Sequence, residues 1–343
     1  MNFMIVDIED IEWIWKMIGK LQLIFHPKYA AEGKLEYSEI TRLGNEKDIL
    51  ILIDRNLFIG LRDLASYGCL KDEKEMRIIA LVMAWALLNN FPIAPGLALK
   101  ECGTQVKSDL AAKMELAMFQ EIFKYYPSMT WLKLADGEID SIPVCDVPKT
   151  PYKIDVDYEE EDDHFLIHFA EMLHLVSLLR NKELSAAEKM LIFLEWNYDK
   201  LIITESTIIY VAMLLTNQKG VRGPKNYNSN NVDKIFAGCR NQAWDLSYLS
   251  SWSQVYCNED KYDKIFFFAT NDLGLKRILV NTFADTKATG CIEYCFSERE
   301  AGRILAFIEQ KQINRIKPDF GENPRQYLYE LIKLEQDNLL TLL

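Results

Sequence analysis

Two carboxylates each follow an apolar run that is typical of a buried strand. Asp54 comes directly after the run 49–53, and Asp272 comes three residues after the run 265–269. Short, continuous apolar runs are typical of strands inside a parallel sheet. Because the carboxyl ends of parallel strands meet at one sheet edge, we expect the two acids to lie close together. Close carboxylates repel each other unless a cation lies between them, so the pattern predicts a Mg²⁺ or Mn²⁺ site.

Two further acids lie in segments with helical character. Glu101 follows a proline-rich turn, in which Pro95 suits the first turn of a helix. Asp245 lies on a helix expected shortly before the strand that leads to Asp272. An alternative remains open for Asp272, which could serve only as the N-cap of the helix that follows it.

The order of these elements resembles the PIN-like nuclease superfamily. The matching pieces are a strand with Asp-x-Asn, a helix with Glu, a helix with Asp, and a strand with Thr-Asn-Asp. In that family four acids hold one or two divalent ions and cut RNA or, less often, DNA. The resemblance covers roughly 49–105 and 233–297, and a long insertion breaks the family's usual spacing. It implies that the catalytic and metal-binding residues are Asp54, Glu101, Asp245 and Asp272, supported by Asn56, Thr270 and Asn271.

The expected fold is α/β, with a central, mainly parallel sheet flanked by helices and a large helical insertion. A last strand is expected at 290–296, where it would close the sheet. Capping boxes at Ser185 and Ser297 predict the starts of two helices. The expected divisions are an N-terminal helical layer 1–48, the first part of the core 49–105, the insertion 106–232, the second part of the core 233–297, and C-terminal helices 298–343.

One basic loop, rich in glycine and asparagine, precedes the helix of Asp245. Its cations could hold phosphates and its tyrosine could stack on a base, since these are the usual contacts to single-stranded RNA. A surface loop that binds no ligand is the alternative. The candidate substrate-binding residues are Lys219, Arg222, Lys225, Tyr227, Arg240 and Lys276.

A second possible metal motif lies in the insertion. His164, His168 and Glu171 share one helical face, a spacing that could bind zinc and support a zinc-type hydrolase. Aromatic residues alternate with them, so a histidine pair packed in the protein without metal is the alternative.

Charge and composition narrow the class of protein. The formal net charge of −12 argues against a broad basic face for coating nucleic acid, although a local basic strip remains compatible with a nuclease. Neither a secretory signal pattern nor an apolar run of about 20 residues is present, so we expect a cytoplasmic protein with no membrane partner. Seven cysteines without a C-x-x-C pair indicate reduced thiols. The leucine-rich segment 325–342 leaves open a homo-oligomer or a regulatory protein partner.

Together these patterns predict a Mg²⁺- or Mn²⁺-dependent endoribonuclease. The expected substrate is single-stranded RNA, with DNA as the second choice, and the bound ion would activate a water for attack on the phosphodiester. The principal alternative is a catalytically inactive PIN-like binding or scaffold protein.

Overall fold

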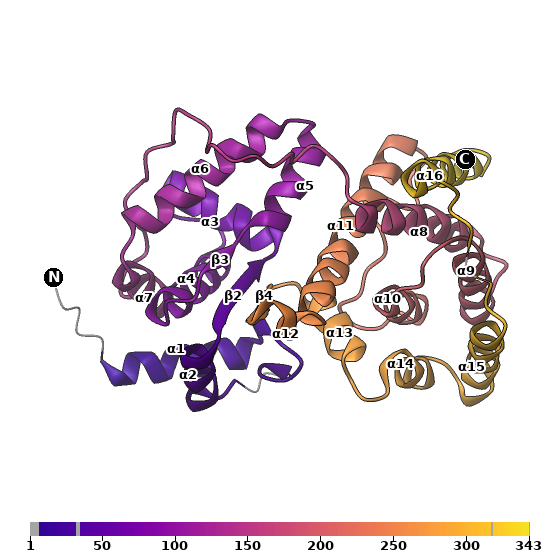
Figure 1. The fold of residues 1–343 in the computed structure, drawn as a ribbon, viewed down its shortest axis with the longest axis horizontal. Helices are drawn as coiled ribbons and strands as arrows, with labels where there is room; N and C mark the ends of the chain where they lie inside the picture. The colour runs from indigo at the N-terminus through magenta and orange to yellow at the C-terminus, as the bar shows by residue number, and fades with distance from the viewer. Residues whose placement is uncertain (1–6, 32–34, 317, 343) are drawn as a thin grey trace. The chain divides into compact units, whose positions relative to one another are not determined.

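The chain divides into two compact units, which are described separately. The computed structural model describes residues 7–31, 35–316 and 318–342 (Figure 1). Unit 1 comprises 1–161 and 252–272, and unit 2 comprises 162–251 and 273–343. The expected insertion 106–232 is thus shared between the units, because the chain passes from one unit to the other at 162.

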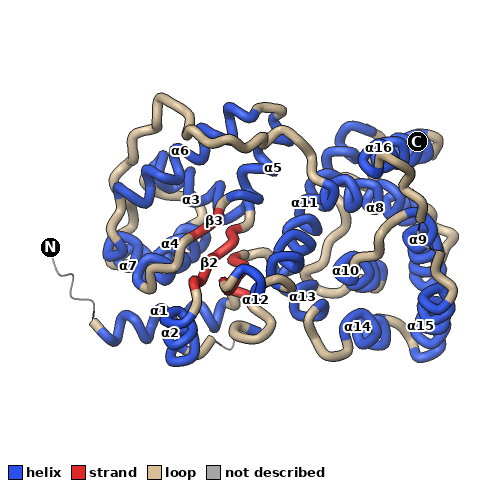
Figure 2. Tube along the Cα trace, viewed as in Figure 1, coloured by secondary structure: helices blue, strands red, loops and turns tan. Residues whose placement is uncertain are grey.

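Unit 1 contains a four-stranded sheet in the order β1-β4-β2-β3. Figure 2 shows the strands in red among the blue helices. β2 (Asp48–Ile53) pairs in parallel with β4 (Lys264–Ala269) and with β3 (Ile93–Ala94). β1 (Ile24–Phe25) pairs with β4 in the antiparallel direction. The expected α/β class is therefore confirmed, but the sheet is small. It is also mixed, because β1 is antiparallel to its neighbour, and β1 comes from a segment that was expected to be helical.

Burial supports the strand assignments of β2 and β4 to different degrees. All five residues of β4 from Ile265 to Ala269 are buried, as expected for a strand covered on both faces. In β2, Ile49, Ile51 and Ile53 are buried while Leu50 and Leu52 are partly exposed. One face of β2 is therefore less completely covered than the aliphatic run predicted.

Helices surround the sheet of unit 1. The most apolar of them, α4, is buried on nearly every side, as predicted, and it packs chiefly on α7. Trp85 of α4 is fully buried and meets Trp15 of α1 and Phe267 of β4 edge to face, and Trp131 of α7 is also fully buried. The bounds are α1 (Ile8–Leu21), α2 (Tyr37–Glu46), α3 (Arg55–Tyr67), α4 (Glu73–Leu88), α5 (Gly96–Val106), α6 (Asp109–Tyr125), α7 (Ser128–Asp136) and α12 (Glu259–Tyr262).

In the part of unit 2 that the structure describes, every regular element is a helix. α8 and α10 are buried on most sides, α8 packs on α16 and α9, and α10 packs on α14 and α13. The predicted capping boxes of Ser185 and Ser297 are both present. The bounds are α8 (Asp163–Arg180), α9 (Ala186–Lys200), α10 (Glu205–Leu215), α11 (Val232–Tyr256, whose last residues belong to unit 1), α13 (Leu273–Thr282), α14 (Lys287–Cys295), α15 (Glu298–Ile313) and α16 (Pro324–Leu340).

The prediction of a strand at 290–296 is wrong, because this segment forms most of helix α14. Cys291 and Ile292 are buried, whereas Glu293 and Tyr294 are exposed. A strand would place neighbouring residues on opposite faces, but a helix allows two successive residues to face its neighbour α10. Across the described residues, no helix has the length and apolarity that a membrane span requires.

Candidate functional site at the β2–β4 edge

The carboxyl ends of β2 and β4 bring two of the predicted polar segments together. The last register pair is Ile53 with Ala269, and the Asp54 amide donates a hydrogen bond to the Ala269 carbonyl at 3.1 Å. One residue further on, the Thr270 hydroxyl donates to Oδ2 of Asp54. The Asp272 amide in turn donates to the Thr270 hydroxyl at 3.0 Å. We call Asp54, Thr270 and Asp272 the strand-edge cluster.

Members of the strand-edge cluster differ in exposure. Asp54 is 2% exposed and Thr270 is 1% exposed, whereas Asp272 is an exposed residue. The Asp54 Oδ1 atom accepts from the Leu57 amide at 2.8 Å, so Asp54 is also the N-cap of α3. Asn56 and Asn271 are both exposed beside the cluster. The cluster thus combines a firmly oriented, buried carboxylate with a solvent-accessible one.

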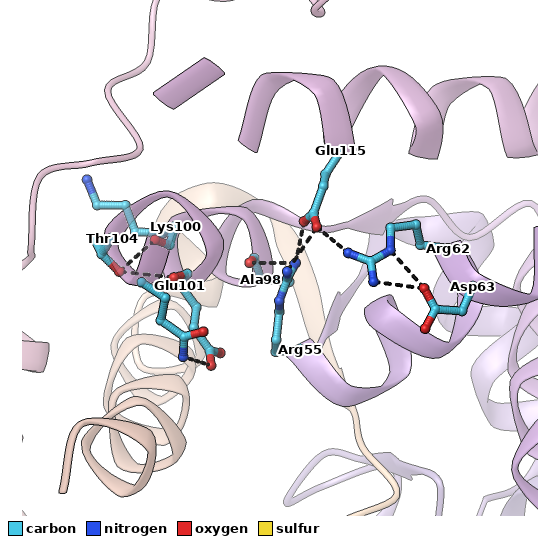
Figure 3. Close-up of polar contacts among 9 residues, drawn as sticks. Arg55, Arg62, Asp63, Ala98, Lys100, Glu101, Thr104 and Glu115 are labelled. Carbon is cyan, nitrogen blue, oxygen red and sulfur yellow. Dashed lines mark hydrogen bonds and ion pairs between the residues drawn. The ribbon is translucent and has the colours of Figure 1, made fainter. Parts of the chain in front are cut away.

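Glu101 lies on α5 as predicted, six positions after Pro95, which precedes the first helical residue. Its side chain is 9% exposed and accepts a hydrogen bond from Gln105 Nε2 at 2.7 Å (Figure 3). The next turn of the same helix is stabilised by the Thr104 hydroxyl, which donates to the carbonyl of Lys100 at 3.0 Å. Glu101 is therefore a largely buried carboxylate of unit 1.

A cluster of ion pairs that the sequence did not reveal holds α3, α5 and α6 together (Figure 3). Arg55, the residue after Asp54, makes a two-pronged ion pair with Glu115 of α6, with Nη2 to Oε1 at 3.0 Å. Arg55 Nη1 also donates to the Ala98 carbonyl of α5 at 3.3 Å. Arg62 Nη1 reaches Glu115 at 2.5 Å and its Nη2 reaches Asp63 at 2.8 Å. We call Arg55, Arg62 and Glu115 the arginine–glutamate cluster.

Electrostatics within the arginine–glutamate cluster favour the charged forms. Burial lowers the pKa of Arg55, but the hydrogen bonds and charge of Glu115, with smaller effects from Cys102 and Glu101, outweigh it and raise that pKa. Burial likewise raises the pKa of Glu115, but both arginines outweigh it and lower that pKa. The hydrogen bond from Arg55 to the Ala98 carbonyl places the first turn of α3 beside α5, the helix that carries Glu101.

Asp245 belongs to unit 2, where it lies on helix α11 as predicted. Its Oδ2 atom accepts from Gln242 Nε2 at 3.2 Å. Burial, and then the charge of Asp245, raise the pKa of the fully buried Tyr210 on α10. The four predicted acids are thus divided, with Asp54, Glu101 and Asp272 in unit 1 and Asp245 in unit 2.

The basic loop before α11 is tied to unit 2 through its backbone. Arg180 Nη1 donates to the carbonyls of Tyr227 and Ser229, both at 2.9 Å, and the Tyr210 hydroxyl donates to the Arg222 carbonyl at 3.0 Å. Gly238 of α11 permits the contact, because a Cβ atom there would lie 1.8 Å from the Lys225 carbonyl oxygen. The loop is therefore held at several points along its length.

Of the six candidate substrate-binding residues, four lie in this loop, Arg240 lies on α11 and Lys276 lies on α13. Their side chains have different surroundings. The side chains of Lys219, Arg222 and Lys225 are exposed. The Arg240 guanidinium stacks on Phe165 and Phe169, 4.8 Å and 5.3 Å from the ring centroids. Tyr227 is half-buried and Lys276 is 9% exposed. The three exposed cations are accordingly the best placed to meet a phosphate.

The predicted histidine motif is a packed polar cluster. His168 and Glu171 are both fully buried, and His168 Nδ1 lies 2.7 Å from Glu171 Oε2. His168 Nε2 lies 2.7 Å from the Ser250 hydroxyl, and His164 is partly exposed. Glu171 also accepts from Asn197 at 2.6 Å and from Thr207 at 3.0 Å. We call His168, Glu171, Asn197, Thr207 and Ser250 the helix cluster.

In the helix cluster, Ser250 contacts His168 and His168 contacts Glu171, as in the catalytic triads of some hydrolases. The surroundings of these residues argue against nucleophilic catalysis by Ser250. Ser250 lies inside α11, where backbone amides are used in the helix and cannot form an oxyanion hole. His168 and Glu171 are completely enclosed, and the polar contacts link α8, α9, α10 and α11. The cluster is therefore best explained as a buried connection among four helices.

Among the residues that the structure describes, no group of three or more His, Cys, Asp or Glu side chains is arranged to hold a metal ion. Mg²⁺ keeps several waters and commonly binds through only one or two carboxylates. No family model, curated protein or solved structure matches the chain.

Proposed function

We propose that the strand-edge cluster is the metal-binding centre of a PIN-like nuclease that hydrolyses phosphodiester bonds in single-stranded RNA. The observation that supports this most directly is that the Thr270 hydroxyl links the Asp54 carboxylate to the backbone amide of Asp272. Parallel strands deliver both residues to one edge, which is where α/β proteins bind their ligands. The wider assignment, a parallel core interrupted by a helical insertion, belongs to the same proposal.

In this proposal, each residue of unit 1 has a separate role. The Leu57 amide and the Thr270 hydroxyl hold the Asp54 carboxylate in one orientation, with one of these donors on each oxygen. Asp272 supplies an exposed carboxylate, and Glu101 adds negative charge from α5. When bound, Mg²⁺ or Mn²⁺ would lower the pKa of the attacking water and stabilise the leaving 3′ oxygen. The products would carry a 5′-phosphate and a 3′-hydroxyl.

Charged residues of unit 2 provide the proposed contact to the substrate. The exposed side chains of Lys219, Arg222 and Lys225 would bind phosphates of the RNA. Replacing all three by Gln should weaken binding and reduce the slope of log affinity against log salt by about 2, since each phosphate contact on a single strand contributes about 0.7. Lys71, Lys74 and Lys107, which are exposed in unit 1, form the matched control triple variant.

Cleavage of labelled single-stranded RNA with Mn²⁺ tests the centre itself. Asp54→Asn and Asp272→Asn should each remove cleavage, because both change a proposed ligand without changing its size. The matched controls are Asp48→Asn and Asp263→Asn, which alter exposed acids at or just before the opposite ends of the same two strands. Asp245→Asn tests separately whether the acid of unit 2 is needed for cleavage. Full activity of both Asp54→Asn and Asp272→Asn would refute the proposal.

A second candidate is a catalytically inactive PIN-like protein that binds a partner. It is favoured by the double use of Asp54, which caps α3 and accepts from Thr270 and so has a structural role without any metal. Thermal unfolding with and without Mn²⁺ separates the candidates, because an ion bound only by the folded state raises the melting temperature. A shift in the wild type that disappears in Asp272→Asn supports the nuclease, and no shift supports the binding protein.

A further inference from the structure

Two cysteines of unit 2 lie close together at the end of helix α14. Cys291 Sγ and Cys295 Sγ are 3.9 Å apart, and both thiols are reduced. Cys291 is 3% exposed, while Cys295 is partly exposed and is the last helical residue. The pair therefore consists of one thiol that solvent can reach and one buried thiol directly behind it.

The backbone geometry permits the two sulfurs to bond. Residues four apart in a helix are separated by about 6 Å along the axis, which lies within the Cα separations of roughly 4.4–6.8 Å seen in disulfides. The sulfurs must approach by roughly 2 Å, since an S–S bond is about 2 Å long. Cys295 can make this movement because the helix ends there and Phe296 is already extended.

The surroundings also favour reaction at Cys295 first. The hydrogen bond from the Cys291 thiol, opposed by burial and assisted by Thr216, lowers the pKa of Cys295 to about 7. A hydrogen bond to Cys295 and burial raise the pKa of Cys291. Elsewhere in unit 2, burial raises the pKa of Cys239 to about 12, so that thiol is expected to be inert.

We propose that Cys291 and Cys295 form a peroxide-sensitive dithiol, in which Cys295 is oxidised first and Cys291 resolves it to an intramolecular disulfide. The Cys295 thiolate attacks one oxygen of hydrogen peroxide, the O–O bond breaks, and the departing hydroxide takes a proton to become water. The Cys291 thiol then attacks the Cys295 sulfur, the S–O bond breaks, and a second water leaves. The two sulfurs lose two electrons, which the peroxide gains, and a dithiol reductant reverses the change.

Oxidation should loosen the end of α14. Forming the disulfide pulls Cys295 toward Cys291 and disturbs the last helical hydrogen bond, from the Phe296 amide to the Ile292 carbonyl at 3.0 Å. α14 packs on α10, α13 and α15, so amide hydrogen exchange should become faster in 292–296 while the first turn of α15 stays protected by its capping box.

Mass spectrometry after trypsin tests the proposal on the full-length protein. Cleavage after Lys287 and Arg299 leaves both cysteines on one peptide, 288–299. After brief treatment with equimolar peroxide and then iodoacetamide, this peptide should have lost two hydrogens and carry no alkyl group, and prior reduction should restore alkylation of both thiols. Full alkylation of both cysteines after peroxide, or direct conversion of Cys295 to a sulfinic acid, would overturn the proposal.

Single-cysteine behaviour provides the matched controls. Cys69 and Cys257 are exposed but have no second thiol described beside them, so they should remain alkylatable at the same dose. In Cys291→Ser, which keeps a hydrogen-bond donor beside Cys295 but removes the resolving thiol, a sulfenic acid should persist at Cys295 and be trapped by dimedone. The alkylation of Cys295 in the wild type should titrate near pH 7, against about 8.5 for an ordinary thiol. Absence of a dimedone adduct in Cys291→Ser would also contradict the proposal.

Discussion

The strand-edge cluster of unit 1 and the helix cluster of unit 2 use polar residues in opposite ways. In the helix cluster, His168 and Glu171 are fully buried and bonded to side chains of four helices. In the strand-edge cluster, Asp54 is nearly as buried, but Thr270 links it to Asp272, which is exposed. The helix cluster is enclosed, whereas the strand-edge cluster includes a residue that solvent reaches. The difference indicates why the strand edge, and not the helix cluster, is the candidate for a metal site.

The largest expected effect on stability comes from breaking the helix cluster. Glu171→Ala removes the acceptor of His168, Asn197 and Thr207 and leaves these groups buried without it, so it should lower the free energy of unfolding of unit 2 by about 4 kcal/mol. Urea unfolding measures the change. Glu195→Ala, at an exposed position of α9, is the control and should change it by less than about 0.5 kcal/mol. A loss below about 1 kcal/mol for Glu171→Ala would show that the cluster is not a structural connection.

The arginine–glutamate cluster should show an intermediate effect. Glu115→Gln removes the charge that pairs with Arg55 and Arg62 and should destabilise unit 1 by about 2 kcal/mol, since hydrogen bonds to charged groups are strong. The control is Glu121→Gln, because the ion pair of Glu121 with Lys124 is more exposed. Equal urea midpoints for Glu115→Gln and the wild type would contradict the assignment.

The same cluster also predicts a pH dependence. The pKa of Glu115 is lower in the folded state than in the unfolded chain, so its contribution is fully present above the unfolded value of about 4.3 and is lost as pH falls through the folded value. Wild-type stability should therefore fall more steeply in acid than that of Glu115→Gln. Parallel pH profiles of the two proteins would exclude Glu115 as the source.

Substitution of Asp54 separates its capping role from its charge. Asp54→Ala removes the acceptor for both the Leu57 amide and the buried Thr270 hydroxyl and should cost about 1.5 kcal/mol. Asp54→Asn keeps a carbonyl oxygen for the Leu57 amide and should cost less. Equal losses in thermal or urea unfolding would mean that the charge or the Thr270 contact, and not the cap alone, stabilises this part of unit 1.

The smallest effect on stability is expected at Asp272. Asp272→Asn changes an exposed side chain and should alter the free energy of unfolding by less than about 0.5 kcal/mol. Under the proposed function, the same variant loses RNA cleavage. Asp272→Asn should therefore lose activity while keeping its stability, whereas Glu171→Ala should lose stability. A large stability loss in Asp272→Asn would make this residue a structural one and weaken the comparison.

Local patterns predicted the main elements of both units. The apolar runs before Asp54 and Asp272 are strands β2 and β4, and the boxes at Ser185 and Ser297 begin helices. The segment 290–296 was misassigned because Cys, Ile, Tyr and Phe suit a strand when taken alone. Its packing against α10 decides the outcome in favour of a helix. β1 and β3, with two residues each, are too short to leave a pattern.

By itself, the sequence determined where buried strands end in polar residues and which helices have an apolar face, because these properties depend on neighbours along the chain. Only the tertiary structure decided that β2 lies beside β4, that Thr270 bonds to Asp54, and that Glu115 pairs with Arg55. It also divided the four predicted acids between two units. These outcomes depend on contacts between residues far apart in the chain, and a hydrophobic pattern carries no information about which partner a surface will meet.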